Sequence, residues 1–116
     1  LVKKRITVGA GATSDQILQG TTYEYVDPGT RIVVAAGDAT GTYAGATNMN
    51  FTVNNSEFAK DALVSEEVSG QPFGWNNTAY VMNDTVTTGN VRNRPVVTFT
   101  NTGGSSATID VAIFIA

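Results

Sequence analysis

The chain has 116 residues, a formal net charge of −3, 15% charged residues, and neither histidine nor cysteine. This length fits one domain, residues 1–116, that buries roughly two-thirds of its unfolded surface. Without histidine or cysteine there is no disulfide, thiolate metal site, or Ser-His or Cys-His catalytic pair, so we predict that the protein is not an enzyme and holds no cofactor.

Charge and hydropathy exclude two further classes. A protein that binds duplex nucleic acid needs a concentrated basic footprint, and seven Lys and Arg against ten Asp and Glu do not supply one. No run approaches the ~20 consecutive apolar residues that a membrane-spanning helix needs. We therefore expect neither specific nucleic-acid binding nor a membrane span.

The first third of the chain is predicted to form strands around turns. Residues Val2–Val8 alternate apolar and polar side chains, which predicts a strand. Residues 13–20 fit either one helical turn or an extended loop, and we favour the loop. Residues 22–26 and 31–36 are strand-like runs on either side of the turn sequence Asp-Pro-Gly-Thr, so they predict a hairpin.

The middle of the chain continues this rhythm. Residues Thr47–Val53 alternate large apolar side chains with Asn and Thr, which predicts a half-buried strand. Residues 58–68 suit a helix or a strand, and we favour the strand because hairpins are predicted on either side. Residues 69–78 are predicted to form a loop that carries the only tryptophan, and a short strand begins at residues 80–82.

The stretch 94–116 organises the rest. Two β-branched and aromatic runs, 94–102 and 107–116, flank a small-residue turn and predict a β-hairpin. Because side chains alternate along a strand, the second run places its Ile and Val residues on one face. Its other face carries Asp, Ala, Phe and Ala, so the strand is nearly apolar on both sides. Such a strand belongs between two sheets, or between a sheet and a neighbouring subunit.

The count is seven or eight short strands, separated by Gly, Pro and Asn, with little helix. Short strands at this spacing predict an all-β sandwich or barrel. The many threonines agree with this, because a β-branched polar side chain suits a half-exposed pleated surface.

Several of these segments also resemble a known family. They are Tyr23-Glu-Tyr, residues 31–36, and residues 80–89, 94–102 and 107–113. On them the chain is similar to small single jelly-roll virion proteins, the minor capsid or vertex proteins of tailless icosahedral bacteriophages. The resemblance implies a jelly roll that assembles around a symmetry axis in a virion, without catalysis. It carries over no functional residue, because it brings no invariant chemical site.

Two groups of residues are candidate contact sites with open interpretations. Lys3, Lys4 and Arg5 fit an arm that touches packaged nucleic acid, but we favour charges on an edge strand, which discourage unwanted pairing. Phe73 and Trp75 lie in a Gly- and Asn-rich loop. They either anchor a neighbouring subunit or stack on a sugar, or they fold back and plug one end of the sandwich.

The second face of the last strand is the third candidate site. Ala112, Phe114 and Ala116 form either a subunit interface or a face buried within the monomer. We favour the interface, because a strand in a single sandwich has one core face and a second apolar face needs a partner. Asp38 and Asp84 fit loop ligands of calcium, but turn formation is the better interpretation of these scattered aspartates.

The leading hypothesis is therefore a structural protein located in the virion, a capsid, vertex or minor capsid subunit. It acts through a symmetric homo-oligomer and contacts with other capsid proteins. The alternative is a carbohydrate-binding or adhesion β-sandwich module that binds a glycan on Trp75, Phe73 and Tyr80.

Overall fold

The computed structural model describes residues 2–41, 45–54, 56–66, 78–81 and 93–115. These residues form seven strands and no helix. The strands are β1 (Val2–Val8), β2 (Ile32–Asp38), β3 (Thr47–Val53), β4 (Ser56–Leu63), β5 (Thr78–Val81), β6 (Pro95–Asn101) and β7 (Ala107–Ile115).

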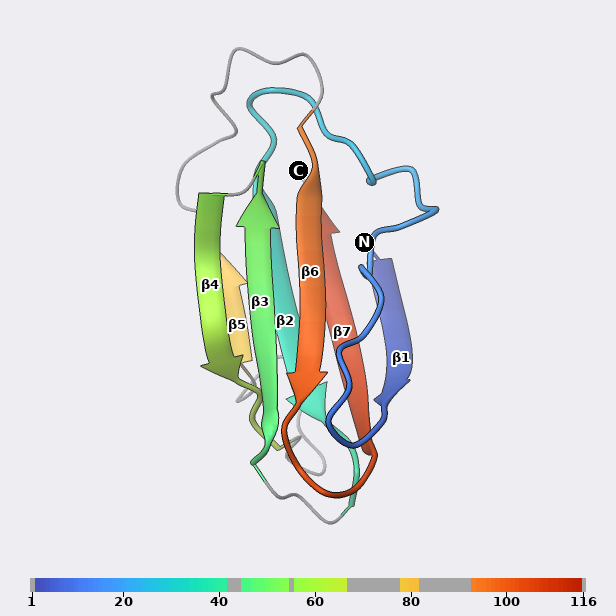
Figure 1. Cartoon of the computed structure of the whole chain (residues 1–116). Helices are drawn as coiled ribbons and strands as arrows, with labels where there is room; N and C mark the ends of the chain where they lie inside the picture. The colour runs from blue at the N-terminus through green and yellow to red at the C-terminus, as the bar shows by residue number, and fades with distance from the viewer. Residues whose placement is uncertain (1, 42–44, 55, 67–77, 82–92, 116) are drawn as a thin grey trace.

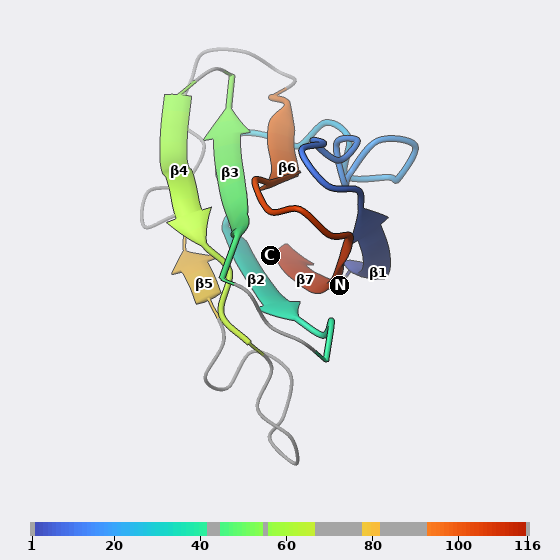
Figure 2. The ribbon, with the colours of Figure 1, turned by 60° about the horizontal axis from the view of Figure 1, so that its bottom comes forward.

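The strands form two antiparallel sheets, which confirms the all-β prediction. One sheet has the order β1-β7-β2-β5 and the other the order β4-β3-β6. The sheets lie face to face as two layers (Figures 1 and 2). The predicted strand after residue 58 is confirmed as β4, and no helix forms there.

The core fills the space between the two layers. Large side chains from both inner faces are fully buried, because every second residue of a strand points inward. They include Phe51, Met49, Phe99 and Val97 from one sheet and Ile32, Val34, Ile109, Val111 and Ile113 from the other. The predicted apolar face of the last strand is therefore a core face.

Strand β7 lies in the middle of its sheet, between β1 and β2. It pairs with β1 on one side, where Ile113 is opposite Val2, and with β2 on the other, where Ile113 is opposite Val34. Because β7 has a partner strand on each side, the backbone hydrogen-bonding groups along both of its edges are satisfied within the sheet.

The predicted hairpin of residues 94–116 is wrong. Strand β6 pairs with β3, whereas β7 belongs to the other sheet. The turn between them carries the chain across the core from one layer to the other (Figure 2). Both strands have a strongly apolar face, and these faces are buried by packing against opposite sides of one core. If the two strands paired within one sheet, their apolar faces would lie on the same side, and a further layer would have to bury them.

The predicted hairpin of residues 22–26 with 31–36 is also wrong. Residues 22–25 form turns and bends, and Val26 makes only an isolated bridge to Asn93. The predicted turn is present, since the backbone N–H of Thr30 donates to the carbonyl of Asp27 at 3.3 Å. Strand β2 instead pairs with β7 and β5, because its nearly continuous apolar run suits the inside of a sheet.

Residues 12–17 cover the free edge of β6 as an extended loop, which confirms the interpretation that we favoured. Backbone N–H groups of Ser14 and Ile17 donate to carbonyls of β6 at 2.7 and 3.0 Å. The next residue, Leu18, is fully buried between the layers. This loop therefore satisfies the exposed edge of β6 and closes the open side of the core between β6 and β1 (Figure 1).

A lysine holds this loop against β1. Lys4 shares the inward register of Val2 and Ile6, opposite Val111 of β7. Its Nζ donates to the carbonyl of Ile17 at 2.9 Å. A charge that points inward on an edge strand also discourages pairing with another strand.

Asn101, at the end of β6, ties three parts of the chain together and is 1% exposed. Its Nδ2 donates to the carbonyl of Val8 at 3.1 Å and to that of Ser105 at 2.7 Å. Its Oδ1 accepts from the backbone N–H of Gly103 at 2.9 Å. The turn that crosses between the sheets is therefore fixed by one buried amide.

We predict that Asn101→Ala lowers the free energy of unfolding by about 2–3 kcal/mol, because it leaves buried backbone groups without partners. Urea denaturation followed by tryptophan fluorescence measures the loss. Asn48→Ala is the matched control, since Asn48 lies on the outward register of β3 and is half-buried. Equal losses in the two variants would contradict this role of Asn101.

Candidate functional site

The outer face of the sheet β1-β7-β2-β5 contains the predicted interface residues. Since Ile113 and Val111 point inward, Ala112 and Phe114 point outward. The register places Val33 of β2 beside Phe114 and Ala35 beside Ala112. We call these four residues, Val33, Ala35, Ala112 and Phe114, the apolar outer patch.

The four residues differ in exposure. Phe114 is 51% exposed, whereas Ala112 is 1% and Ala35 5% exposed. Val33 is half-buried. Phe114 is thus the side chain of this patch that presents a large apolar surface to solvent. Ala116, the third residue of the predicted interface, lies outside the described residues.

An ion pair borders the patch on the same face. Arg5 of β1 donates from Nε to Asp110 Oδ1 at 2.7 Å and from Nη2 to Asp110 Oδ2 at 2.8 Å. This two-pronged geometry is the strongest form of such a pair. The Arg5 side chain is 66% exposed, so solvent screens the pair and it contributes at most about 1 kcal/mol.

The structure does not gather the three basic residues into one patch. Lys3 and Arg5 lie on the outer face opposite Ala112 and Asp110, whereas Lys4 lies on the inward register and binds the loop of residues 12–17. All three belong to an edge strand. This placement agrees with the edge-strand interpretation that we favoured.

Several predicted site residues cannot be placed. Phe73, Trp75 and Asp84 lie outside the described residues, and Tyr80 belongs to the short strand β5. The two parts that do come together, the outer patch and the ion pair, share one sheet.

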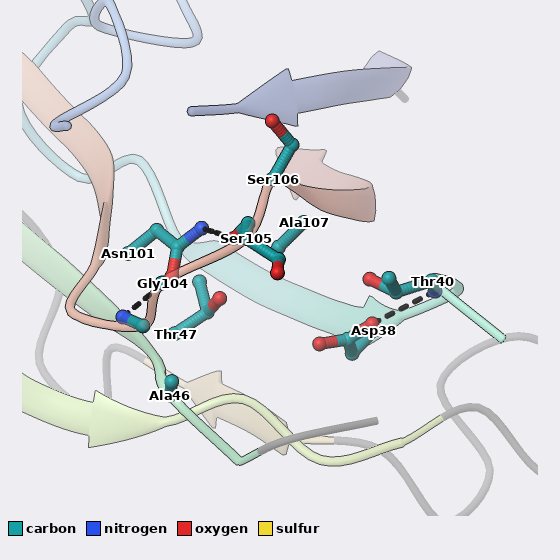
Figure 3. A pocket seen from close by; sticks show the side chains of 10 residues that line it. Asp38, Thr40, Ala46, Thr47, Asn101, Gly104, Ser105, Ser106 and Ala107 are labelled. Carbon is teal, nitrogen blue, oxygen red and sulfur yellow. Dashed lines mark hydrogen bonds between the residues drawn. The ribbon is translucent and has the colours of Figure 1, made fainter. Parts of the chain in front are cut away.

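A polar pocket lies at one end of the sandwich, where β2 ends, β3 begins and the β6–β7 turn passes (Figure 3). It has a volume of about 140 Å³. We call it the end pocket. It is lined by Asp38, Thr40, Ala46, Thr47, Asn101, Gly103, Gly104, Ser105, Ser106 and Ala107.

Buried polar residues form the wall of this pocket. Asp38 is 4% and Thr47 1% exposed. Asp38 Oδ1 accepts a hydrogen bond from the backbone N–H of Thr40 at 2.8 Å. The hydroxyl of Thr40 in turn accepts from the backbone N–H of Thr108 at 3.0 Å. Of these pocket residues, sequence reasoning singled out Asp38, and an acidic residue at the end of a buried strand was a usable signal for a built site.

Within the described ranges, no group of three or more His, Cys, Asp or Glu side chains is placed to hold a metal ion. The same part of the chain has no helix of the length and apolarity that crossing a membrane requires.

Neither a protein-family model, nor a curated protein, nor a solved structure matches this chain. The resemblance to bacteriophage virion proteins therefore stays a prediction. Function has to be argued from the strand order, the outer patch and the end pocket.

The two adjacent glycines of the β6–β7 turn, Gly103 and Gly104, lead to a testable prediction. A Cβ on Gly103 would lie 3.0 Å from Ala46 Cβ and 3.2 Å from Asn101 Oδ1, whereas a Cβ on Gly104 would meet nothing within 4 Å. We expect Gly103→Ala to destabilise the fold by about 1–3 kcal/mol through overpacking. Gly104→Ala should stay close to wild type.

Thermal unfolding of both variants, followed by circular dichroism, checks this difference. The two substitutions add the same atoms to adjacent residues, so each controls for the loss of backbone freedom in the other. A Gly104→Ala variant as unstable as Gly103→Ala would show that the close approach of Ala46 and Asn101 is not the cause.

Proposed function

We propose that this protein is a virion structural protein: a capsid, vertex or minor capsid subunit with a single jelly-roll domain. It assembles into a symmetric homo-oligomer and contacts other capsid proteins. The order in which its strands pair is the observation that supports this proposal best.

A jelly roll is an eight-stranded antiparallel ribbon wrapped on itself, so its first strand pairs with its last, its second with its seventh, and so on inward. Here β1 pairs with β7, β2 with β5, and β3 with β4. The loop of residues 12–17 bonds along β6. Counted as an irregular second strand, this loop supports a jelly-roll order for the chain.

The wrapped order has a mechanical consequence that suits a shell protein. Most pairings join residues far apart in the sequence, as in the contact of Val2 with Ile113. The two ends of the described chain are therefore held in adjacent strands of a closed, rigid unit. Such a unit can keep its shape while its surfaces contact several neighbours.

The outer faces of the two sheets differ in composition, and this difference suggests which face contacts another subunit. On the sheet β4-β3-β6, the outward residues of β3 are Asn48, Asn50 and Thr52. On the other sheet, the outward residues of β7 and β2 include Phe114, Ala112 and Val33. A self-complementary contact needs an apolar centre with a polar rim. The apolar outer patch with the Arg5–Asp110 pair beside it has this composition.

The carbohydrate-binding alternative is not advanced further. Its proposed platform depended on Trp75 and Phe73, which lie outside the described residues. The described residues that line the end pocket include no aromatic side chain on which a sugar ring would stack.

The proposal predicts the effect of a charge on the outer patch. Phe114→Asp should abolish self-association and leave the monomer folded, because Phe114 is half exposed and not part of the core. Native mass spectrometry of the purified protein measures the assembly, and circular dichroism checks the fold. The protein concentration needed for assembly should rise more than tenfold, since buried apolar anchors dominate interface energies.

Leu63→Asp is the matched control. Leu63 is 52% exposed, almost the same as Phe114, but it lies on edge strand β4 of the other sheet. It should assemble like the wild type. A wild-type protein that remains monomeric at high concentration, or a Leu63→Asp variant that loses assembly while Phe114→Asp keeps it, would refute the proposed interface.

A further inference from the structure

We propose that the end pocket binds a primary ammonium group. The evidence begins with the Asp38 carboxylate, which is 4% exposed. Its Oδ1 accepts a hydrogen bond from the backbone N–H of Thr40. Within the described part of the chain, its Oδ2 accepts none. A largely buried carboxylate is stabilised by a charged donor at its remaining oxygen, because charge-assisted hydrogen bonds are the strong ones.

The second carboxylate oxygen, Asp38 Oδ2, opens into the pocket and is not fully enclosed by protein atoms. Gln16 Nε2 is the one side-chain polar atom among the described residues that is fully enclosed and has no partner. The Oδ2 of Asp38 therefore keeps contact with the pocket space. In Figure 3 the Asp38 oxygen that does not bond Thr40 and the hydroxyl of Thr47 point into the space between them.

The sign of the charge excludes anions and favours cations. Among the described residues, the pocket lining contains Asp38 and no Lys or Arg, so no positive side chain of this lining neutralises the carboxylate. The chain as a whole carries a net charge of −3, which adds to the attraction for a cation. A ligand with a positive charge and hydrogen-bond donors satisfies both requirements of Asp38 Oδ2.

The geometry favours an ammonium over a guanidinium or a calcium ion. A guanidinium binds best as a fork to both oxygens of a carboxylate, and Thr40 already occupies Oδ1. Calcium takes six to eight oxygen ligands and its affinity grows with the number of carboxylates, whereas the described lining of this pocket supplies one, Asp38. An ammonium is a compact charge with three donors.

The remaining donors of the ammonium also find acceptors here. The Thr47 hydroxyl, in a residue that is 1% exposed, faces Asp38 across the pocket. Ser105 belongs to the turn that lines the pocket and carries a further hydroxyl. The volume of about 140 Å³ admits the ammonium and the first carbons of an alkyl chain. The ligand is therefore either a small alkylamine or the lysine side chain of a neighbouring subunit.

The test is a titration of the ¹⁵N-labelled protein with butylammonium chloride at constant ionic strength. We expect saturable shifts of the backbone amide signals of Thr40 and Thr47. Tetramethylammonium has the same charge but no N–H donor, and it should cause no saturable shift at these residues. Calcium chloride should bind more weakly than butylammonium.

Two variants assign the effect to Asp38. Asp38→Asn keeps an oxygen for the Thr40 N–H, so the fold should survive, but it should weaken butylammonium binding tenfold or more. Asp27→Asn, in the exposed turn before β2, should bind like the wild type. Absence of saturable shifts, equal shifts with tetramethylammonium, or tighter binding of calcium would overturn the proposal.

An experiment on the assembled protein distinguishes the two sources of the ammonium group, a small amine and a lysine of a neighbouring subunit. If butylammonium releases subunits at the concentrations that fill the pocket, a lysine of a neighbouring subunit is the natural occupant. If the assembly keeps its mass while butylammonium fills the pocket, the natural occupant is a small amine. Only the lysine source rests on the proposed assembly, because the titration itself works equally on a monomer.

Discussion

The packing of two apolar sheet faces against each other is the constraint on which the rest of this structure depends. Phe51 and Phe99 from one sheet meet Ile109 and Ile113 from the other, and all four are fully buried. Burying each such side chain is worth roughly 1.5–3 kcal/mol, which exceeds the contribution of any single hydrogen bond or ion pair described above. Because both faces must be covered, the chain has to cross between the layers instead of folding back within one sheet.

This crossing places polar backbone at the two ends of the sandwich, where it must be satisfied. At one end Asn101 bonds the crossing turn. At the other, Asn93 is fully buried, accepts from Asn54 Nδ2 at 2.7 Å and donates from Nδ2 to the carbonyl of Val26 at 3.3 Å. Buried amides thus connect loops that are distant in sequence. An amide can do this because it both donates and accepts hydrogen bonds.

The end pocket and the outer patch follow from the same architecture in different ways. The pocket forms where the crossing turn passes the end of β2 and the start of β3, with the buried carboxylate of Asp38 in its wall. The patch forms because β7 and β2 are central strands whose outward residues are small or apolar. One feature suits a small charged group and the other a flat protein surface, so the two can act independently.

The sequence by itself determined the all-β class, β1 and β3 to the residue, and the inward apolar face of β7, because alternation of side chains is a local property. It did not determine partners. Residues 94–116 and 22–36 both had the local form of hairpins, yet their strands pair elsewhere. Only the tertiary structure decided these points and assembled the pocket around Asp38, because strand pairing depends on which faces bury each other across the whole chain.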